Sequence, residues 1–348
     1  MTTPPGTPEL EDDAAWMAEA VALGRSVRTE TSPNPWVGAV VVPAGDEPAA
    51  EGATQPPGGP HAEAVALELA GASARGATVY VTLEPCSHHG RTPPCADALI
   101  AAGVRRVVVG VVDPDPHVSG RGLARLREAG IEVEVGVLAA EAEASLRPYL
   151  AHRRRGRPWV VLKLAATLDG RIAAPDGSSR WITGPAARMD AHQLRAESDA
   201  ILVGAGTVRA DDPALTVRDV PGRDPLRPNP LRVVLGHPPE GARVLPAEVH
   251  DGALEPLLDD LGRRGFVQLL VEGGARVAWS FHQSGLVDQY VLYLAPALLG
   301  GDDGLPLFSG PGAPTMADVW RGRIEGIRRL GSDVRIDLVA GEGEGAVR

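Results

Sequence analysis

Short apolar runs alternate with helical segments along most of this 348-residue chain. In the first half, Val-rich runs at 36–42, 77–83 and 105–112 are separated by stretches with helical periodicity at 61–71 and 93–104. Strands that alternate with helices of this length predict a largely parallel sheet covered by helices on both faces. The chain is therefore expected to be an α/β protein.

The length of the chain points to two domains, because a typical domain has about 100–200 residues. The segment SLRPYLAHRRRGRPWV combines a basic cluster with flanking prolines, which favours a boundary. We expect a first domain at 1–147, a linker at 148–157 and a second domain at 158–348. The second domain again alternates strands and helices, and Thr183 is expected to cap the helix that starts at Pro185.

The composition is typical of a globular protein, with 44% hydrophobic and 23% charged residues. No apolar run is long enough to cross a bilayer, and the acidic, Pro-rich start MTTPPGTPELEDDAAW lacks the features of a secretory signal. The net charge of −11 argues against broad binding of nucleic acid, which needs a basic surface. We expect a cytoplasmic protein that acts on small molecules, without nucleic-acid or membrane partners, and we also expect a homo-oligomer.

Three residues with nitrogen or sulfur donors occupy places that suit one metal site. His61 starts a predicted helix, Cys86 follows a predicted strand, and Cys95 opens the next helix. Three such ligands without a fourth in view are typical of a catalytic zinc ion, which keeps one position for water. Glu63, two residues after His61, is placed to move protons without binding the metal, as in zinc-dependent nucleobase deaminases.

Other interpretations of these residues are weaker. An H-x-E pair is common, and two cysteines in a long chain are more often buried thiols. A disulfide is disfavoured in a reducing compartment. Much rarer is the combination of H-x-E at a helix start, Pro-Cys after a strand and a second Cys at the next helix start. We therefore favour a site with one zinc ion per chain. His88 and His89, between the cysteines, are competing candidates for metal ligands, but we expect them to line the substrate pocket or fill the loop.

The cysteine spacing departs from the P-C-x-x-C pattern of many zinc deaminases, because eight residues lie between Cys86 and Cys95. PCSHHGRTPPC, together with PNPWVGAVVV and DPDPHVSGRG, resembles the deaminase half of the bifunctional riboflavin-biosynthesis deaminase–reductases, over residues 12–147. This resemblance implies a cytidine-deaminase-like domain of three layers. It also implies hydrolytic removal of an amino group from a diaminopyrimidinone that carries a ribosylamino phosphate.

The same resemblance implies three substrate contacts in this half. Asn34 is placed to contact the pyrimidine, and His88 and Arg91 belong to the loop that binds the ligand. Two positions differ from the family pattern, since Thr54 stands where we expect His and Asp115 where we expect Asn.

Glycine turns at two strand ends characterise the second half. VGAGTVRADDP follows one strand, and VEGGARV joins another strand to a helix. Such turns bring backbone amides close to a phosphate, but the third glycine and the acidic residue of a dinucleotide fingerprint are missing. A nucleotide-binding α/β fold is favoured, although tight connections between strands and helices would use the same glycines.

LKLAATLDGRIA, SRWITG, GAGTVRADDPALTVR and VEGG resemble the reductase half of the same family, over about residues 158–340. The resemblance implies a dihydrofolate-reductase-like fold that uses NADPH to reduce the ribose of the deaminated intermediate to a ribityl chain. The residues implied for NADPH binding are Ala165, Trp181, Thr207, Asp211, Gly274, Ala275, Arg276, Val277, Ala278, Trp279 and Ser280. Those expected to bind the substrate are Lys163, Ser179, Arg195, Leu215, Arg218 and Glu272.

The residue types suit this reduction. Arg195 and Arg218 offer planar donors to the 5′-phosphate of the substrate. Reduction of an imine needs a proton donor, for which Asp211 and Glu272 are the two candidates. Lys163 is the only lysine of the chain, which suggests a position where arginine does not substitute, and we expect it to contact the sugar or the phosphate.

Two rival functions explain fewer of these features. A nucleic-acid-editing deaminase with an accessory domain would need clusters of aromatic and basic residues. A non-catalytic zinc scaffold would close the metal site with a fourth ligand and would have no use for Glu63. The sequence therefore predicts a bifunctional enzyme that performs zinc-dependent deamination and then NADPH-dependent reduction.

Overall fold

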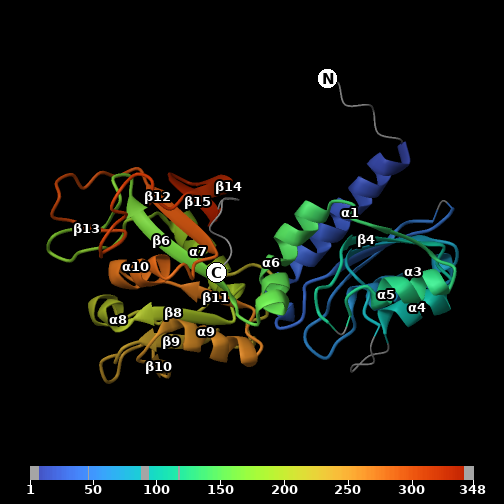
Figure 1. Ribbon diagram of the computed structural model, residues 1–348, viewed down its shortest axis with the longest axis horizontal. Helices are drawn as coiled ribbons and strands as arrows, with labels where there is room; N and C mark the ends of the chain where they lie inside the picture. Colours follow the sequence, from blue (N-terminus) through green and yellow to red (C-terminus); the bar gives the residue numbers. More distant parts are fainter. Residues whose placement is uncertain (1–7, 46, 88–93, 117, 341–348) are drawn as a thin grey trace. The chain divides into compact units, whose positions relative to one another are not determined.

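The structure, a computed structural model, describes residues 8–45, 47–87, 94–116 and 118–340. The chain forms two compact units, Met1–Gly156 and Arg157–Arg348, and each contains helices packed on a sheet of its own (Figure 1). The prediction of an α/β protein is confirmed in both units. Each unit is described separately below.

The first unit is built on a five-stranded sheet with the order β2-β1-β3-β4-β5. β1 pairs antiparallel with both β2 and β3, whereas β3, β4 and β5 run parallel. The sheet is therefore mixed, and the prediction of a largely parallel sheet was wrong for this half. The strands are β1 Gly38–Val42, β2 Ala50–Ala53, β3 Thr78–Leu83, β4 Arg106–Val111 and β5 Glu132–Val135.

Helices cover both faces of this sheet, as predicted. α1 and α6 lie together on one face, and α3, α4 and α5 lie on the other (Figure 1). On the first face, Met17 and Ala20 of α1 pack against Val40, Tyr80 and Val108 of the strands. The helices are α1 Pro8–Ser26, α2 Arg28–Thr31, α3 Ala62–Ala70, the short 3-10 helix Gly71–Ala74, α4 Cys95–Ala102, α5 Arg121–Glu128 and α6 Ala139–Arg155.

Most of the segment expected to be a linker, residues 148–157, is helical. Residues 148–155 form the end of α6 and belong to the first unit. Leu146, Tyr149 and Leu150 bury their side chains along this helix, and that burial outweighs the disfavoured Pro148 inside it. The basic cluster after them forms the exposed last turn, where positive charge also suits the helix dipole.

The second unit contains an eight-stranded sheet with the order β10-β9-β8-β11-β6-β12-β15-β14. The strands from β10 to β12 pair in parallel, and β15 and β14 add an antiparallel edge. Its strands are β6 Trp159–Thr167, β8 Ala200–Gly204, β9 Leu231–Leu235, β10 Glu248–His250, β11 Gln268–Val271, β12 Gln289–Ala295, β14 Gly322–Leu330 and β15 Asp333–Ala340. A separate two-stranded sheet pairs β7 Arg171–Ala173 with β13 Leu305–Pro306.

Two apolar cores lie on the two faces of this sheet, because successive strand residues point to opposite sides. Ala200 and Leu202 of β8 pack in the core beneath α9 and α10, whereas Ile201 and Val203 pack in the core beneath α7. The helices are α7 Pro185–Ala196, α8 Ala205–Asp211, α9 Leu254–Arg263 and α10 Ala275–Gln283.

Two further observations concern individual helices. α7 begins at Pro185 as predicted, but its capping position is occupied by Gly184, not by Thr183. Within the described residues, no helix is both long and apolar enough to cross a membrane.

Candidate active sites

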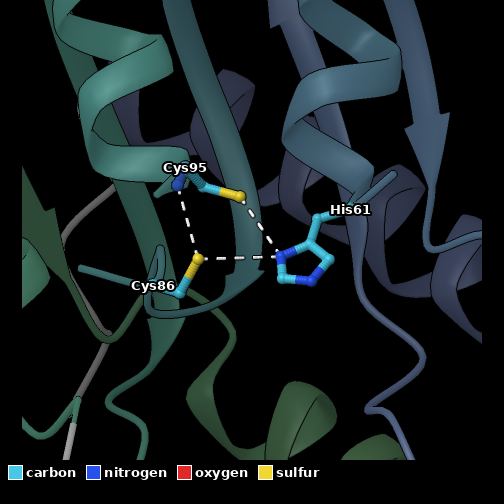
Figure 2. Close-up of side chains that lie close together, drawn as sticks. All are labelled: His61, Cys86 and Cys95. Atoms are coloured by element: carbon cyan, nitrogen blue, oxygen red, sulfur yellow. Dashed lines mark hydrogen bonds between the residues drawn. The ribbon is translucent and has the colours of Figure 1, made fainter. Parts of the chain in front are cut away.

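The side chains of His61, Cys86 and Cys95 converge in the first unit. Their donor atoms all lie within 4.8 Å of one another. Nδ1 of His61 is 3.3 Å from Sγ of Cys95 and 3.7 Å from Sγ of Cys86 (Figure 2). Among the described residues, this is the group of histidine, cysteine or carboxylate side chains that is arranged for one metal ion.

The ends of three elements bring these side chains together. His61 caps the start of α3, Cys86 follows the end of β3, and Cys95 is the first residue of α4. Two backbone contacts fix the two cysteines relative to each other. The N–H of Cys95 donates to Sγ of Cys86 at 3.3 Å, and the N–H of Ala96 donates to the carbonyl of Cys86 at 3.1 Å.

One sulfur of the cluster carries the electrostatic feature that suits a cation, whereas the pKa of Cys95 is raised by its hydrogen bond with Cys86. A hydrogen bond from the Cys95 thiol lowers the pKa of Cys86 to about 4, so this sulfur is readily ionised. The hydrogen bond with Cys86 raises the pKa of His61. One imidazole nitrogen and two sulfurs, one of them prone to ionise, form a donor set that fits zinc.

Glu63 lies beside this cluster, in the first turn of α3. Its side chain is buried, with 4% of its surface exposed, and it hydrogen-bonds to Cys95. Burial raises the pKa of Glu63 to about 7, which is suitable for a group that both accepts and returns a proton near neutral pH.

The other residues expected in this half have varied environments. Asn34 lies half-buried in the loop before β1. Thr54 is buried, and its hydroxyl bonds to the backbone N–H and carbonyl of Val37, so in this chain it joins the loop after β2 to the start of β1. Asp115 is 3.6 Å from Arg153 of α6. The remaining predicted residues, His88 and Arg91, fall outside the described residues.

The second unit contains a large cleft of about 1540 Å³. It opens at the carboxyl ends of β8 and β11, where open α/β sheets bind their ligands. Fourteen of the residues expected to bind NADPH or substrate line it, and they are Lys163, Ala165, Ser179, Trp181, Arg195, Thr207, Asp211, Leu215, Arg218, Glu272, Gly274, Ala275, Arg276 and Val277.

The last three residues expected at NADPH do not line the cleft. Ala278 is fully buried in the core on the sheet side of α10. The indole N–H of Trp279 donates to the carbonyl of Pro311, and the Ser280 hydroxyl bonds back to Arg276 within the helix. α10 turns these side chains away, so only its first turn reaches the cleft.

Glu272 and Arg195 form a buried ion pair in the cleft. Nε and Nη2 of Arg195 donate to the two carboxylate oxygens at 2.5 and 2.8 Å, and Nη1 donates to the carbonyl of Thr216 at 3.2 Å. Burial alone would raise the pKa of Glu272, but the charge and hydrogen bonds of Arg195, together with the charges of Lys163 and His192, outweigh it and lower the pKa to about 2. Glu272 is therefore a carboxylate at neutral pH. Burial also lowers the pKa of the nearby Lys163.

Small residues let α10 approach the ends of β8 and β11 closely. A methyl group at Gly204 would lie 2.7 Å from Val277, and one at Gly273 would lie 2.5 Å from the same side chain. The N–H of Gly274 donates to the hydroxyl of Thr207 at 3.1 Å. The cleft therefore meets the N-terminus of α10, where a phosphate is well accommodated, and the residues fit a dinucleotide.

Several cleft residues were missed by the sequence analysis. His192 of α7 accepts the backbone N–H of Arg218 at 3.2 Å and lies 3.3 Å from its guanidinium. The guanidinium of Arg188 lies 4.5 Å from the centre of the exposed Trp181 ring. Helical spacing from Arg195 places Arg188, Ala191 and His192 near the same side of α7, which was the available signal.

Comparison with known protein families divides the chain in the same way. Residues 10–111 match the cytidine and deoxycytidylate deaminase zinc-binding region, and residues 158–336 match the RibD C-terminal domain. The expected cytidine-deaminase-like and dihydrofolate-reductase-like folds are thereby confirmed, and the domain matches assign zinc to the first unit and NADPH to the second.

Relatives match over nearly the whole chain. The riboflavin biosynthesis protein RibD of Escherichia coli is 44% identical, and the match covers 94% of this chain and 99% of the relative. The crystal form 1 structure of RibD from Acinetobacter baumannii has a TM-score of 0.89 at 38% identity and covers 96% of this chain and 100% of that one.

A third similar structure comes from Thermotoga maritima. It is a diaminohydroxyphosphoribosylaminopyrimidine deaminase/5-amino-6-(5-phosphoribosylamino)uracil reductase, with a TM-score of 0.85, 35% identity, and coverage of 96% of this chain and 100% of that one. A domain match over half of the chain and full-length relatives at this identity show that the chain belongs to the RibD family, the bifunctional deaminase–reductases of riboflavin biosynthesis.

Proposed function

We propose that the two units catalyse consecutive reactions on one substrate. The first unit deaminates a diaminohydroxyphosphoribosylaminopyrimidine and the second reduces 5-amino-6-(5-phosphoribosylamino)uracil, the two activities named for the Thermotoga maritima relative. We infer that the deamination is hydrolytic and that the reduction uses NADPH to give the ribityl chain. The observation that carries this proposal is the convergence of His61, Cys86 and Cys95 next to the buried Glu63, in a chain whose other unit holds a separate cleft.

In the deamination, the zinc ion would be held by His61, Cys86 and Cys95. When bound, zinc would activate water as the nucleophile for attack on the pyrimidine carbon that carries the amino group. Glu63 is placed to take a proton from the attacking water and to deliver it to the amino group as the bond between that group and the ring carbon breaks. Its pKa of about 7 supports both transfers, and its burial in α3 fixes the direction in which the carboxyl group points.

In the reduction, the first turn of α10 and the residues Ala165, Trp181 and Thr207 hold NADPH. In the ring-opened imine form of the substrate, the cofactor would supply a hydride to the sugar carbon of the C=N bond, and a proton donated to the nitrogen would complete the amine. Of the two candidate acids, we assign proton donation to Asp211, because Glu272 is held as a carboxylate by Arg195. Ser179 lies 3.4 Å from Asp211 and orients its carboxyl group.

The role of Arg195 is revised from phosphate binding to positioning. The guanidinium nitrogens of Arg195 already donate hydrogen bonds to Glu272 and Thr216, so few N–H groups remain to bind a phosphate. The guanidinium of Arg218 donates to the hydroxyl of Thr216 at 2.6 Å and lies 3.3 Å from His192, but unlike that of Arg195 it is exposed in the cleft, which favours Arg218 as the phosphate ligand. Glu272, Lys163 and Leu215 would then contact the ribose.

We further propose that the protein works in the cytoplasm on small phosphorylated pyrimidines, without nucleic-acid or membrane partners. The net charge of −11 supports the first exclusion. The proposed assembly is a homo-oligomer, the form that most soluble oligomers take. Measurement of the molar mass by light scattering tests it, and a single-chain mass would contradict it.

The assignment of the first unit is tested with Glu63→Gln and metal analysis. The wild type should contain about one zinc ion per chain and release ammonia from the diaminopyrimidine substrate in the absence of NADPH. Glu63→Gln should keep the zinc ion and lose ammonia release by at least about a hundredfold, because it retains the shape of the side chain but not its base. Zinc-free wild-type protein, or a fully active variant, would contradict the assignment.

A further inference from the structure

A second buried carboxylate lies next to the metal site, on Glu84, the residue that follows β3 directly. Only 4% of its surface is exposed. It stands two positions before Cys86, and Pro85 separates them. Glu84 therefore lies at the junction between β3 and the loop that carries the sulfur of Cys86.

The carboxylate of Glu84 accepts four backbone N–H groups. Oε1 accepts those of Gly122 at 2.9 Å and Leu123 at 3.4 Å, both in the first turn of α5. Oε2 accepts those of Gly120 at 2.9 Å and Asp113 at 3.3 Å. One side chain thus accepts hydrogen bonds from the backbone N–H groups at the start of α5, where no side chain caps the helix. It also accepts one from the segment that follows β4.

Backbone packing reinforces this junction. A methyl group on Gly122 would lie 2.0 Å from the carbonyl oxygen of Pro85, so α5 approaches the residue before Cys86 as closely as a glycine permits. Sγ of Cys86 in turn accepts the N–H of Cys95 from α4. The position of this sulfur is consequently set from two sides, by α4 directly and by α5 through Glu84 and Pro85.

We propose that Glu84 is a positioning residue for the metal site, which holds Cys86 in the geometry for zinc by anchoring its loop to α5. The proposal rests on the metal-ligand role of Cys86 proposed above. Partners that orient metal ligands typically contribute a factor of about 10 to 100 in metal affinity, because an unanchored ligand must be reordered each time the metal binds. Loss of the Glu84 contacts should therefore show first as faster loss of zinc.

The test compares zinc release from the full-length wild-type protein and its variants into a colorimetric chelator. Glu84→Gln replaces one acceptor oxygen by an amide donor that faces backbone N–H groups, and it should speed zinc release by about tenfold or more. Glu84→Asp keeps the charge but shortens the reach, so its release rate should lie between those two proteins. Reduction of pre-deaminated substrate by the second unit serves as an internal check and should be unchanged.

Asp13→Asn is the matched control. Asp13 is also buried, with 2% exposed, and it accepts hydrogen bonds from Tyr80 and Arg106, away from the ligand loop. Asp13→Asn should lower the Tm of the protein. At a temperature where this variant stays folded, it should release zinc at the wild-type rate. Equal release rates from Glu84→Gln and Asp13→Asn would overturn the proposal.

Three further outcomes are also decisive. If Glu84→Gln does not fold, the comparison of Glu84→Asp with Asp13→Asn decides, and a wild-type release rate for Glu84→Asp overturns the proposal. If the wild type itself holds no zinc, the metal-site assignment fails and this inference with it. A wild type that holds zinc as firmly as its Glu84 variants refutes only the role of Glu84.

Discussion

Arg195 and Glu272 illustrate how one residue pair serves both stability and chemistry. Both side chains are largely buried, at 14% and 10% exposure, and they pair through two hydrogen bonds. A buried pair of this kind contributes little relative to apolar residues, but losing one partner leaves an uncompensated charge. The pair therefore keeps Glu272 ionised in the cleft. Loss of either partner lowers the stability of the fold.

Arg195→Met should lower the free energy of unfolding by about 3 kcal/mol, because Glu272 is left buried and unpaired. The double variant Arg195→Met/Glu272→Gln should recover part of this loss, since no unpaired carboxylate remains. Urea unfolding of the single and double variants measures both effects. Equal stability of wild type and Arg195→Met would show that the pair is not buried in solution.

The pH dependence of stability follows from the same carboxylate. Its pKa is lowered from 4.5 to about 2 in the folded protein, so its stabilising effect is complete above pH 4.5 and is lost as the pH falls from there towards 2. The stability advantage of the wild type over Glu272→Gln should therefore shrink across that window. Urea midpoints measured at several pH values test this, and a constant difference would contradict it.

Asp211 is the proposed proton donor of the reduction. Asp211→Asn should lower kcat for NADPH oxidation by about a hundredfold, within the range for general acids, while NADPH still binds. Steady-state kinetics on deaminated substrate and a separate measurement of the NADPH Kd distinguish these two effects. A small loss in kcat, with a larger loss for Lys163→Met, would move the proton donor to Lys163.

At the scale of elements, the close contact between α10 and the ends of β8 and β11 shapes the cofactor site. Gly204 and Gly273 are small because Val277 occupies the space above them. This contact brings the first turn of α10, with its unpaired N–H groups, to the wall of the cleft. Any side chain at these glycines would push the helix away from the cofactor.

Gly273→Ala should raise the Kd for NADPH about tenfold, since overpacking at such a contact costs about 1–3 kcal/mol. Combining it with Val277→Ala should restore much of the affinity by removing the side chain that the new methyl group meets. Gly312→Ala is the matched control, because a methyl group there meets nothing within 4 Å and Gly312 does not line the cleft. Equal NADPH affinity of Gly273→Ala and Gly312→Ala would contradict the packing explanation.

The sequence predicted the elements with a strong hydrophobic periodicity. It missed elements that lie at an exposed edge or that are buried only by residues distant in the sequence. Apolar runs such as WVVLKLAAT correspond to β6, and HAEAVALELAGA corresponds to α3. The hairpin of β14 and β15 was missed, since GRIEGIRRL lies at an exposed edge and carries three arginines. The end of α6 was interpreted as a linker because its burial depends on packing that a basic, proline-containing sequence does not reveal.

The two sites also differed in how far the sequence alone could predict their residues. His61, Glu63, Cys86 and Cys95 were singled out from the sequence because local spacing tied each one to the start or end of an element. The pairing of Arg195 with Glu272 and the contact of His192 with Arg218 join residues that are remote in sequence. Pairings of this kind depend on how strands are ordered in the sheet, which the local pattern does not determine.

At the scale of the whole molecule, two units with different chemistry share one chain. The metal cluster belongs entirely to the first unit, and the described cleft belongs entirely to the second. Their proposed reactions form a sequence, since the product of the deaminase is the substrate of the reductase. Each reaction should therefore respond to its own cofactor alone.

Removal of zinc with a chelator should abolish ammonia release while leaving the reduction of deaminated substrate within about twofold of the untreated rate. The reason is that no ligand of the cluster belongs to the second unit. Parallel assays of ammonia and NADPH on the same preparation measure this, and added zinc should restore the first activity. Loss of both activities on chelation would show that the second unit also depends on the metal.

The most direct test of the proposed reaction order is to follow NADPH oxidation and ammonia release together, starting from the diaminopyrimidine substrate. The wild type should release one ammonia for each NADPH oxidised. Glu63→Gln should oxidise no NADPH until deaminated substrate is supplied, and then do so at the wild-type rate. NADPH oxidation by Glu63→Gln without prior deamination, or none by the wild type even with deaminated substrate, would contradict the proposed sequence of reactions.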